Sequence, residues 1–286
     1  MKSILLAVLL MALVCGCEKS EQEQEKTKEK AKDIQIEVPD NTFTFVDSAG
    51  KTYKVPLLEE VPKCEYDYSR LVEQNGYKYY KDSAGNIDSK IGIDVSKYQE
   101  EIDWKKVKNS GMDFAVIRLG YRGYSEGRLK EDEYFRQNME GAKDAGLDVG
   151  VYFLSQALSE EEALEEAQFV LECIEDYELA YPVVFDTEEI PDEDARTKDL
   201  DKEQYTKNCI TFCDAIREKG KETMIYSNMN WMAFTLDLTK LIDYDFWYAD
   251  YEPTPQCPYI FKMWQYTEKG KVPGVEGDVD INIWFE

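Results

Sequence analysis

The sequence predicts an α/β protein: a modified TIM-like (β/α) barrel with reduced later helices, preceded by a small β-rich N-terminal region. From Ile91 onward, short apolar runs alternate with helical patterns, which is typical of βα units. The length of 286 residues suits one large barrel with an appendage. A hydrophobic content of 43% and an aromatic content of 13% provide a sizeable core and exclude global disorder.

Eight apolar runs from residue 91 onward are predicted as strands, and four amphipathic segments between the first five are predicted as helices. After Tyr226 the spacing shortens, which leaves little room for long helices between the last strands. The predicted strands are 91–95, 114–119, 149–154, 183–186, 223–226, 246–248, 262–266 and 279–284. The predicted helices are 104–111, 133–145, 160–176 and 203–219.

Side-chain periodicity indicates the buried face of the last two helices. Ser159 and Glu162 form a capping-box pattern at the start of the segment 160–176. Its apolar residues recur on one face, at Leu164, Ala167, Leu171 and Ile174. In the segment 203–219, the predicted buried stripe consists of Tyr205, Cys209, Phe212 and Ile216.

The N-terminus resembles the signal of a bacterial lipoprotein. Lys2 precedes an apolar stretch over 4–14, which is too short to span a bilayer as a mature helix. Gly16 and Cys17 match the cleavage and acylation positions of a lipobox. We therefore expect a signal peptide over 1–16, lipidation of Cys17 and a charged, lipid-anchored linker over 17–33. The protein would then act extracytoplasmically, anchored to the bacterial cell membrane. Acylation of Cys15 and an ordinary secretory signal are the alternatives.

Residues 34–90 are predicted to form the small β-rich region. Residues 43–46 and 51–55 have the pattern of a hairpin with Gly50 at the turn. The aromatic segment 76–80 faintly resembles one copy of a cell-wall-binding repeat. Because such repeats normally occur in arrays, we expect this lone copy to be a simple hairpin.

Charge and histidine content exclude several classes of function. The chain has 34 Lys and Arg against 59 Asp and Glu, and this net charge of −25 repels nucleic acid phosphates and anionic lipid headgroups. Histidine is absent, which excludes Ser-His and Cys-His mechanisms and removes the commonest zinc ligand. Hydrolytic chemistry would then depend on carboxylates, Tyr, Lys or a metal held by oxygen, and glycosidases need only carboxylates. We expect no cofactor, no metal and no nucleic acid partner.

The cysteines after Cys17 are odd in number and form no metal-binding pattern. Cys209 and Cys213 are four apart on a predicted helix and share a face, but histidine and a second cysteine pair are missing. We predict that these thiols are buried and act as small apolar groups, with one disulfide as the alternative. The cysteines are Cys64, Cys173, Cys209, Cys213 and Cys257.

Carboxylates end two of the predicted strands, where parallel barrels gather their ligands. Asp94 ends the first strand, and Asp186 and Glu188 lie on one face at the end of the fourth. Crowding Asp186 and Glu188 should separate their pKa values, leaving one protonated acid and one ionised partner, as glycosidic cleavage requires. Alternatively, Asp94 caps the following turn, and the other two begin a solvated acidic loop.

Motifs spread over residues 90–286 together resemble the glycoside hydrolases of family 25, lysozymes of the bacterial and phage type. The family often has histidine after its substrate-facing tyrosine, where this chain has Phe153, which leaves the fine substrate preference open. In chain order, the motifs are Gly92-Ile93-Asp94-Val95-Ser96-x-x-Gln99, Ile102-Asp103-Trp104, the strand 114–118, Gly150-Val151-Tyr152, Asp186-x-Glu188, Trp264-Gln265-Tyr266 and Val279-Asp280-x-Asn282.

The resemblance implies a modified barrel and hydrolysis of the β-1,4 bond between N-acetylmuramic acid and N-acetylglucosamine. It makes Glu188 the general acid/base and Asp186, Asp94 and Asp280 the other active-site carboxylates. Tyr152 matches a substrate-facing tyrosine. Further substrate-binding candidates are Tyr226, Trp247, Tyr251, Trp264 and Gln265, with Tyr121 another possible sugar platform, although we expect only one or two aromatic residues to face the groove.

In the mechanism that this resemblance suggests, Glu188 protonates the leaving oxygen and later deprotonates a water. The sugar's own N-acetyl oxygen attacks the anomeric carbon while Asp186 stabilises the cation. Direct attack by an aspartate and an inverting route stay open. The partner would be peptidoglycan glycan strands, and we expect a monomer. The alternative functions are a catalytically inactive cell-wall-binding lipoprotein and a solute-binding lipoprotein.

Overall fold

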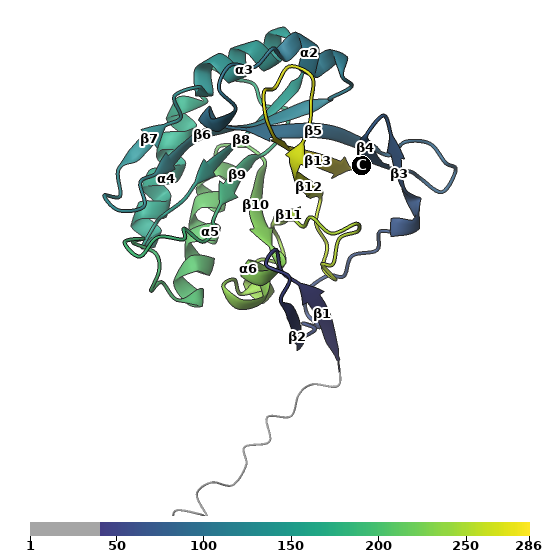
Figure 1. Cartoon of the computed structure of the whole chain (residues 1–286). Coiled ribbons are helices and arrows are strands. Elements are labelled where there is room, and N and C mark those ends of the chain that lie inside the picture. Colours follow the sequence, from purple (N-terminus) through teal and green to yellow (C-terminus); the bar gives the residue numbers. More distant parts are fainter. Residues whose placement is uncertain (1–40) are drawn as a thin grey trace, which may run out of the picture. The chain divides into compact units, whose positions relative to one another are not determined.

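Eight strands close into a barrel in the computed structural model, which describes residues 41–286 (Figure 1). The strands follow the order β5–β13–β12–β11–β10–β9–β8–β6, and the pairing of β6 with β5 closes the sheet. They are β5 Ser89–Val95, β6 Phe114–Arg122, β8 Asp148–Leu154, β9 Val183–Asp186, β10 Thr223–Asn228, β11 Asp245–Ala249, β12 Met263–Gly270 and β13 Val279–Phe285. All eight predicted strands are confirmed. The predicted signal peptide, Cys17 and the linker lie outside the described residues.

The direction of the last strand corrects the expectation of a parallel barrel. Neighbouring strands from β5 to β12 are parallel, whereas β13 is antiparallel to both β12 and β5. Only residues 271–278 join β12 to β13, and a parallel crossover needs roughly a dozen residues or more. β13 therefore begins at the barrel mouth, where the other seven strands end. A short extra strand, β7 Leu129–Glu131, pairs antiparallel with the end of β6.

The helices lie between the early strands. The first four match the predicted helices, and the short α6 was not predicted. Within residues 41–286 no α-helix follows β11 or β12, so the fold is a mixed α/β barrel with few helices. None of the helices there is long and apolar enough to cross a membrane. The helices are α2 Trp104–Asn109, α3 Phe135–Asp144, α4 Glu160–Cys173, α5 Lys202–Arg217, α6 Met229–Phe234 and the 3-10 helices η1 Tyr68–Arg70, η2 Lys97–Gln99 and η3 Leu238–Lys240.

The alternation of side chains along the strands produces two apolar clusters. In β6, Ala115, Ile117 and Leu119 point outward and join the larger cluster between sheet and outer layer. Phe114 and Val116 point inward and join a small cluster inside the barrel. This inner cluster fills one end of the barrel, and the polar inward residues that come later in the strands occupy the other end.

The predicted stripe of α5 is confirmed, because Tyr205, Cys209, Phe212 and Ile216 are all buried. The predicted face of α4 is confirmed only in part: Ala167 and Ile174 are buried, but Leu164 is 40% exposed, and the buried face also contains Ala163, Glu166, Val170 and Cys173. Glu166 is responsible for this rotation, because its fully buried carboxylate accepts a 2.8 Å hydrogen bond from Arg122 Nε of β6. A buried ion pair thus replaces leucine on the inner face.

Two hairpins precede the barrel and pack on its outer surface: β1 Thr42–Val46 with β2 Thr52–Pro56, and β3 Leu71–Gln74 with β4 Tyr77–Tyr80 (Figure 1). Tyr66 stacks on Phe285 of β13 with ring centroids 4.2 Å apart. Tyr77 and Tyr80 are buried in the same core as the barrel strands. The hairpin interpretation of the segment 76–80 therefore holds, since these aromatic rings are not free to bind a wall polymer.

All five cysteines of the described chain are free thiols, and four of them are buried. This agrees with the prediction of small apolar groups rather than a disulfide. Among residues 41–286 no cluster of Cys, Asp or Glu side chains has the geometry of a metal site.

Candidate active site

Five carboxyl groups, those of the four predicted acids and of Glu268, line one pocket of about 200 Å³ at the mouth of the barrel. Asp94 and Asp186 are at the carboxyl ends of β5 and β9, and Glu188 lies two residues further along the chain. Asp280, near the start of β13, lies directly opposite Asp94 in the antiparallel pairing. The expected convergence of these residues thus depends on the reversed direction of β13, since a parallel strand would carry Asp280 to the far end.

Two chains of hydrogen bonds, one through Asn282 and one through Gln265, hold the Asp94 carboxylate; we call them relays. Asp94 Oδ2 accepts from Asn282 Nδ2 at 2.8 Å and from Gln265 Nε2 at 2.9 Å. Asn282 Oδ1 accepts from Trp247 Nε1 at 2.8 Å. Because an indole N–H can only donate, this contact determines which end of the Asn282 amide faces Asp94. The side chain of Asn282 is fully buried, so the arrangement is shielded from water.

The second relay passes through Gln265. Its Oε1 accepts hydrogen bonds from the hydroxyls of Tyr226 and Tyr251, both at 2.9 Å. The amide N–H₂ group is thereby directed at Asp94. Both relays leave Asp94 with a defined orientation.

The carboxyl groups of Asp94 and Asp280 lie on paired residues of β5 and β13, close enough to affect each other's ionisation. Burial raises the pKa of Asp280 to about 9, and the nearby charge of Asp94 contributes to that rise. Burial also raises the pKa of Asp94, whereas the amides of Asn282 and Gln265 lower it. The pair therefore shares a proton at neutral pH, with Asp280 the protonated member.

Asp186 and Glu188 lie in a different environment. Burial raises the pKa of Glu188, the charge of Asp94 raises it further, and Arg118 lowers it. Burial also raises the pKa of Asp186 well above its usual range, with added repulsion from Glu188 and Asp94 and an opposing effect of Arg118. Asp186 Oδ1 is buried and has no hydrogen-bond partner among the described residues.

These environments correct the expectation that crowding alone leaves Asp186 ionised beside a protonated Glu188. Burial raises the pKa of both Asp186 and Glu188. It contributes more to these shifts than the repulsion between the two groups does. In the empty pocket a neutral Asp186 is therefore favoured. A positive charge brought by the substrate would be needed to favour its ionised form.

Arg118 is a functional residue that the sequence patterns did not single out. It lies in β6 among the pocket-lining residues, and it forms a buried ion pair with Asp132, with Nη2 2.6 Å from Oδ2. The signal that could have identified it is the alternation Phe114, Val116, Arg118, which directs the guanidinium inward at the end of a buried strand. It supplies a positive charge within a pocket of acids.

Most of the predicted substrate-binding residues also line this pocket: Tyr152, Tyr226, Trp247, Tyr251 and Gln265. Trp247 is only 1% exposed and forms part of the floor, whereas Tyr251 is 42% exposed at the mouth. The prediction for Trp264 is wrong. Its position next to Gln265 in β12 directs it outward, where its Nε1 donates to the Asp250 carbonyl at 2.7 Å. Tyr121 also lies outside the pocket lining, near Arg118 and Lys130.

The alternative roles for the acids are not supported. Ser96 and Gln99, not Asp94, form the capping box of the turn after β5. Asp94 and Asp186 are each 5% exposed rather than solvated. Phe153 points outward and packs edge to face on Phe169, so the departure from histidine at this position lies away from the pocket.

A barrel whose mouth combines paired carboxyl groups of raised pKa, a buried arginine and aromatic walls has the chemistry of a glycoside hydrolase. The comparison with protein families makes this specific: the model described as glycosyl hydrolases family 25 matches residues 93–275. The chain belongs to this family and is a glycoside hydrolase.

The chain is also similar to individual proteins and solved structures. The uncharacterized protein YegX of Escherichia coli is 28% identical over 217 residues, 73% of this chain and 75% of that protein. The autolytic lysozyme of Clostridium acetobutylicum is 27% identical over 198 residues, 68% of this chain and 56% of that protein. The modular autolysin LytC of Streptococcus pneumoniae superposes with a TM-score of 0.62 at 25% identity, covering 86% of this chain. This chain spans only 57% of the LytC structure.

Proposed function

We propose that this protein is a peptidoglycan hydrolase, a muramidase that cleaves the β-1,4 bond between N-acetylmuramic acid and N-acetylglucosamine. The observation that carries the proposal is the pocket on a family 25 barrel in which the four predicted acids lie together with Glu268. Two relatives support the substrate: one is a lysozyme described as autolytic, and a LytC structure contains a synthetic peptidoglycan ligand.

Glu188 acts as the general acid/base in this proposal. Its raised pKa keeps a proton available for the leaving glycosidic oxygen in mildly acidic solution. After the sugar leaves, the resulting carboxylate removes a proton from the incoming water. Glu188 is more exposed than Asp94 and Asp186, so it can reach a polymer that lies across the mouth of the barrel.

Asp186 stabilises the positive charge that develops at the anomeric carbon. The N-acetyl oxygen of the substrate attacks that carbon as the glycosidic bond breaks, and the resulting cationic ring lowers the pKa of Asp186. Oδ1 of Asp186, which has no hydrogen-bond partner among the described residues, then interacts with the cationic sugar ring. If Asp186 attacked the anomeric carbon directly, Glu188 would transfer the same protons, but the intermediate would be covalently bound to the enzyme.

Asp94 and Asp280 share one proton and position the substrate. The relays through Asn282 and Gln265 hold Asp94, so the pair can offer one donor and several acceptors to sugar hydroxyls or the acetamido group. Tyr152, Tyr226 and Tyr251 provide apolar ring surface and hydroxyls around the same sugar.

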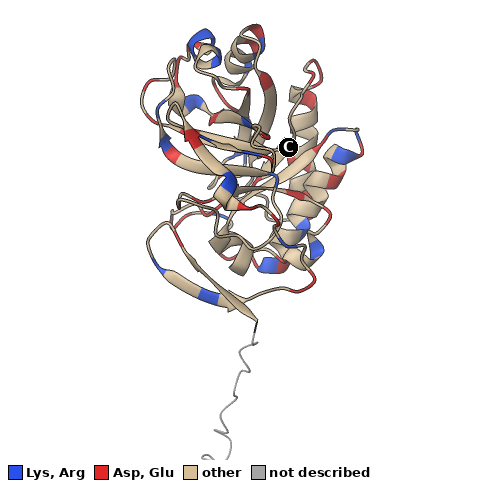
Figure 2. Cartoon of the chain, turned by 90° about the vertical axis from the view of Figure 1, so that its right-hand side faces the viewer, with Lys and Arg blue, Asp and Glu red and all other residues tan. Residues whose placement is uncertain are grey.

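The site of action is extracytoplasmic in this proposal, as the cell-wall substrate requires. Gly16-Cys17 behind a short apolar stretch supports a lipid anchor on the membrane. Metabolic labelling with a fatty acid tests this: Cys17→Ala should lose the label, and a variant that kept it would dismiss Cys17 as the anchor site. Figure 2 shows acidic and basic residues interspersed along the helices, strands and loops of the barrel.

The decisive experiment measures reducing ends released from purified peptidoglycan, with Glu188→Gln beside the unchanged protein. Glutamine keeps the size and hydrogen bonding of glutamate but cannot transfer a proton, so release should fall by about 10² to 10⁴-fold. Sedimentation with the wall should persist. Binding without release by the unchanged protein would instead indicate an inactive wall-binding lipoprotein. Near-normal release by Glu188→Gln would remove Glu188 from the mechanism.

A further inference from the structure

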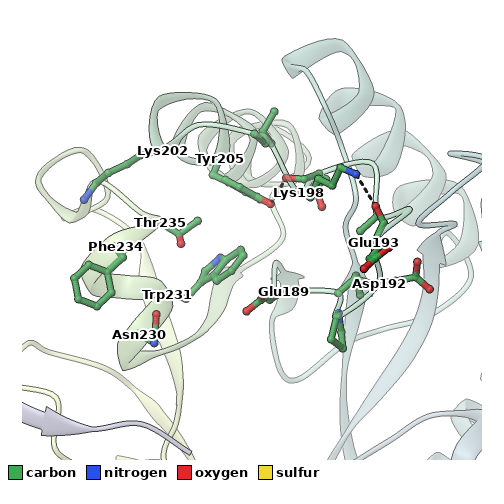
Figure 3. A pocket seen from close by; sticks show the side chains of 15 residues that line it. Glu189, Asp192, Glu193, Lys198, Lys202, Tyr205, Asn230, Trp231, Phe234 and Thr235 are labelled. Atoms are coloured by element: carbon green, nitrogen blue, oxygen red, sulfur yellow. Dashed lines mark hydrogen bonds between the residues drawn. The ribbon is translucent and has the colours of Figure 1, made fainter. Parts of the chain in front are cut away.

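A second pocket lies beside the catalytic one, between the segment that follows Glu188 and helix α6 (Figure 3). Its volume is about 530 Å³, larger than that of the carboxyl-lined pocket. Glu189 lines it and directly follows Glu188 in the chain. A polymer that is bound at Glu188 can therefore reach this second pocket with a short side branch.

One wall of the second pocket is aromatic. Trp231 and Tyr205 meet edge to face with ring centroids 5.2 Å apart, and the 48% exposed Phe234 extends the wall. The Tyr205 hydroxyl donates to the Thr197 carbonyl at 3.0 Å, which holds its ring in place. Trp231 Nε1 is buried and donates to no described residue. This N–H therefore lies below the surface of the aromatic wall, and the exposed parts of the rings are what the pocket offers to a ligand.

The facing wall carries charges of both signs. Glu189, Asp192 and Glu193 contribute carboxylates, and Lys198 contributes an ammonium group near them, whereas Lys202 lies across the pocket on the side of Thr235 and Phe234 (Figure 3). Lys198 Nζ donates to the Glu193 carbonyl at 2.6 Å, so its charge is held at the rim. The Glu189 side chain points to the side of the pocket where Trp231 lies (Figure 3).

This combination favours a peptide over a glycan. A chain of N-acetylated sugars offers no charge to either set of rim groups. The short stem peptide that peptidoglycan carries on the lactyl group of muramic acid offers small apolar side chains, carboxylates and, when not cross-linked, a free ammonium group. Each has a counterpart in the pocket.

We propose that this pocket binds the stem peptide of peptidoglycan, an inference that rests on the proposed function. The small apolar side chains of the peptide pack on the aromatic wall. The free ammonium group pairs with Glu189 and Asp192, while the peptide carboxylates pair with Lys198 and Lys202. The enzyme therefore prefers glycan that carries un-cross-linked peptides to bare glycan.

A binding titration tests the pocket without any turnover. The probe is a synthetic stem tetrapeptide with a free diamino-acid side chain, titrated calorimetrically into the full chain. Saturable binding is expected, weakened about tenfold in Trp231→Ala and in Glu189→Gln. Glu175→Gln, an equal change of charge at an exposed residue outside the pocket, is the matched control and should bind like the unchanged protein. Absence of saturable binding, or equal affinities throughout, would overturn the assignment.

Kinetics then separate this inference from the proposed function. The measured quantity is the ratio of kcat/KM on peptidoglycan to kcat/KM on glycan strands stripped of peptide by an amidase. We expect a ratio of about ten in the unchanged protein and in Glu175→Gln, falling toward one in Trp231→Ala and Glu189→Gln. A ratio of one in the unchanged protein, or parallel losses on both polymers, would overturn the peptide site. If the unchanged protein cut neither polymer, the proposed function would be wrong. The binding titration would then test the peptide pocket by itself.

Discussion

The two halves of the barrel hold their acids in opposite ways. On the half covered by α3, α4 and α5, Asp186 is buried with an unpartnered oxygen, and only Arg118 opposes the rise in its pKa. On the half covered by the N-terminal hairpins, Asp94 accepts two amide hydrogen bonds and pairs with Asp280. The first environment leaves an acid ready to change its charge, and the second fixes an acid in one orientation.

The covering layers explain part of this difference. Long βα connections follow β6, β8 and β9, and their loops bring Glu188 and Glu189 to the mouth. No α-helix follows β11 or β12 in residues 41–286, so aromatic residues of the hairpin region pack there instead, such as Tyr66 against Phe261 and Phe285. We infer that the helical half carries the proton chemistry and the hairpin half carries positioning.

The largest expected effect is a loss of turnover in Asp186→Asn, which can be compared with the loss in Asp94→Asn on the other half of the barrel. Asp186→Asn removes a charge that must develop in the transition state, so turnover should fall by about 10² to 10³-fold. Asp94→Asn can still accept from both amides and donate to Asp280, so we expect a loss of about tenfold. Reducing-end assays at saturating peptidoglycan give both values. Equal losses would show that the halves do not divide the work in this way.

The pH dependence sharpens the assignment on the helical half. Because the pKa of Glu188 is raised, the acid form persists into mildly acidic solution and is lost as the pH rises through that pKa. Above it, kcat should fall about tenfold per pH unit. Initial rates on a soluble glycan over a pH series give this profile. Activity that instead increased into alkaline solution would contradict a protonated Glu188.

The relay on the hairpin half should give a smaller effect. Asn282→Leu removes one donor to Asp94 and leaves the Trp247 N–H without its acceptor. We expect turnover to fall about tenfold and the acidic limb of the pH profile to move upward, since a lost donor raises the pKa of Asp94. The profile is the informative readout, because loss of packing alone would not shift it. Asn86→Leu, at an exposed turn, serves as the matched control.

The smallest expected effect is on stability. Asp280 has a folded pKa of about 9 against an ordinary value of 3.8, so the native state binds a proton that the unfolded chain releases. Stability from this group is full below about pH 4 and is lost as the pH rises toward 9. Asp280→Asn should therefore raise the Tm at neutral pH, by roughly 2–4 °C for each kcal/mol of stability gained in a chain of this size. The gain over the unchanged protein should increase between pH 4 and pH 9, and a constant difference would contradict the raised pKa.

Local patterns in the sequence determined the eight strands, the first four helices and the placement of Asp94, Asp186 and Glu188 at strand ends. Each of these depends on residues close together in the chain: apolar alternation, a helical stripe, or a charged residue that ends an apolar run. The absence of histidine likewise excluded Ser-His and Cys-His mechanisms, because composition alone decides which catalytic groups a chain can offer.

Only the tertiary structure decided which neighbour each strand meets and which face each side chain presents. The antiparallel entry of β13 put Asp280 opposite Asp94, and a one-residue offset in β12 separated Gln265 in the pocket from Trp264 outside it. Glu166 joined the core because Arg122, 44 residues earlier, was buried beside it. Such outcomes arise from contacts between distant segments, and the pKa of a carboxyl depends on those contacts more than on its sequence neighbours.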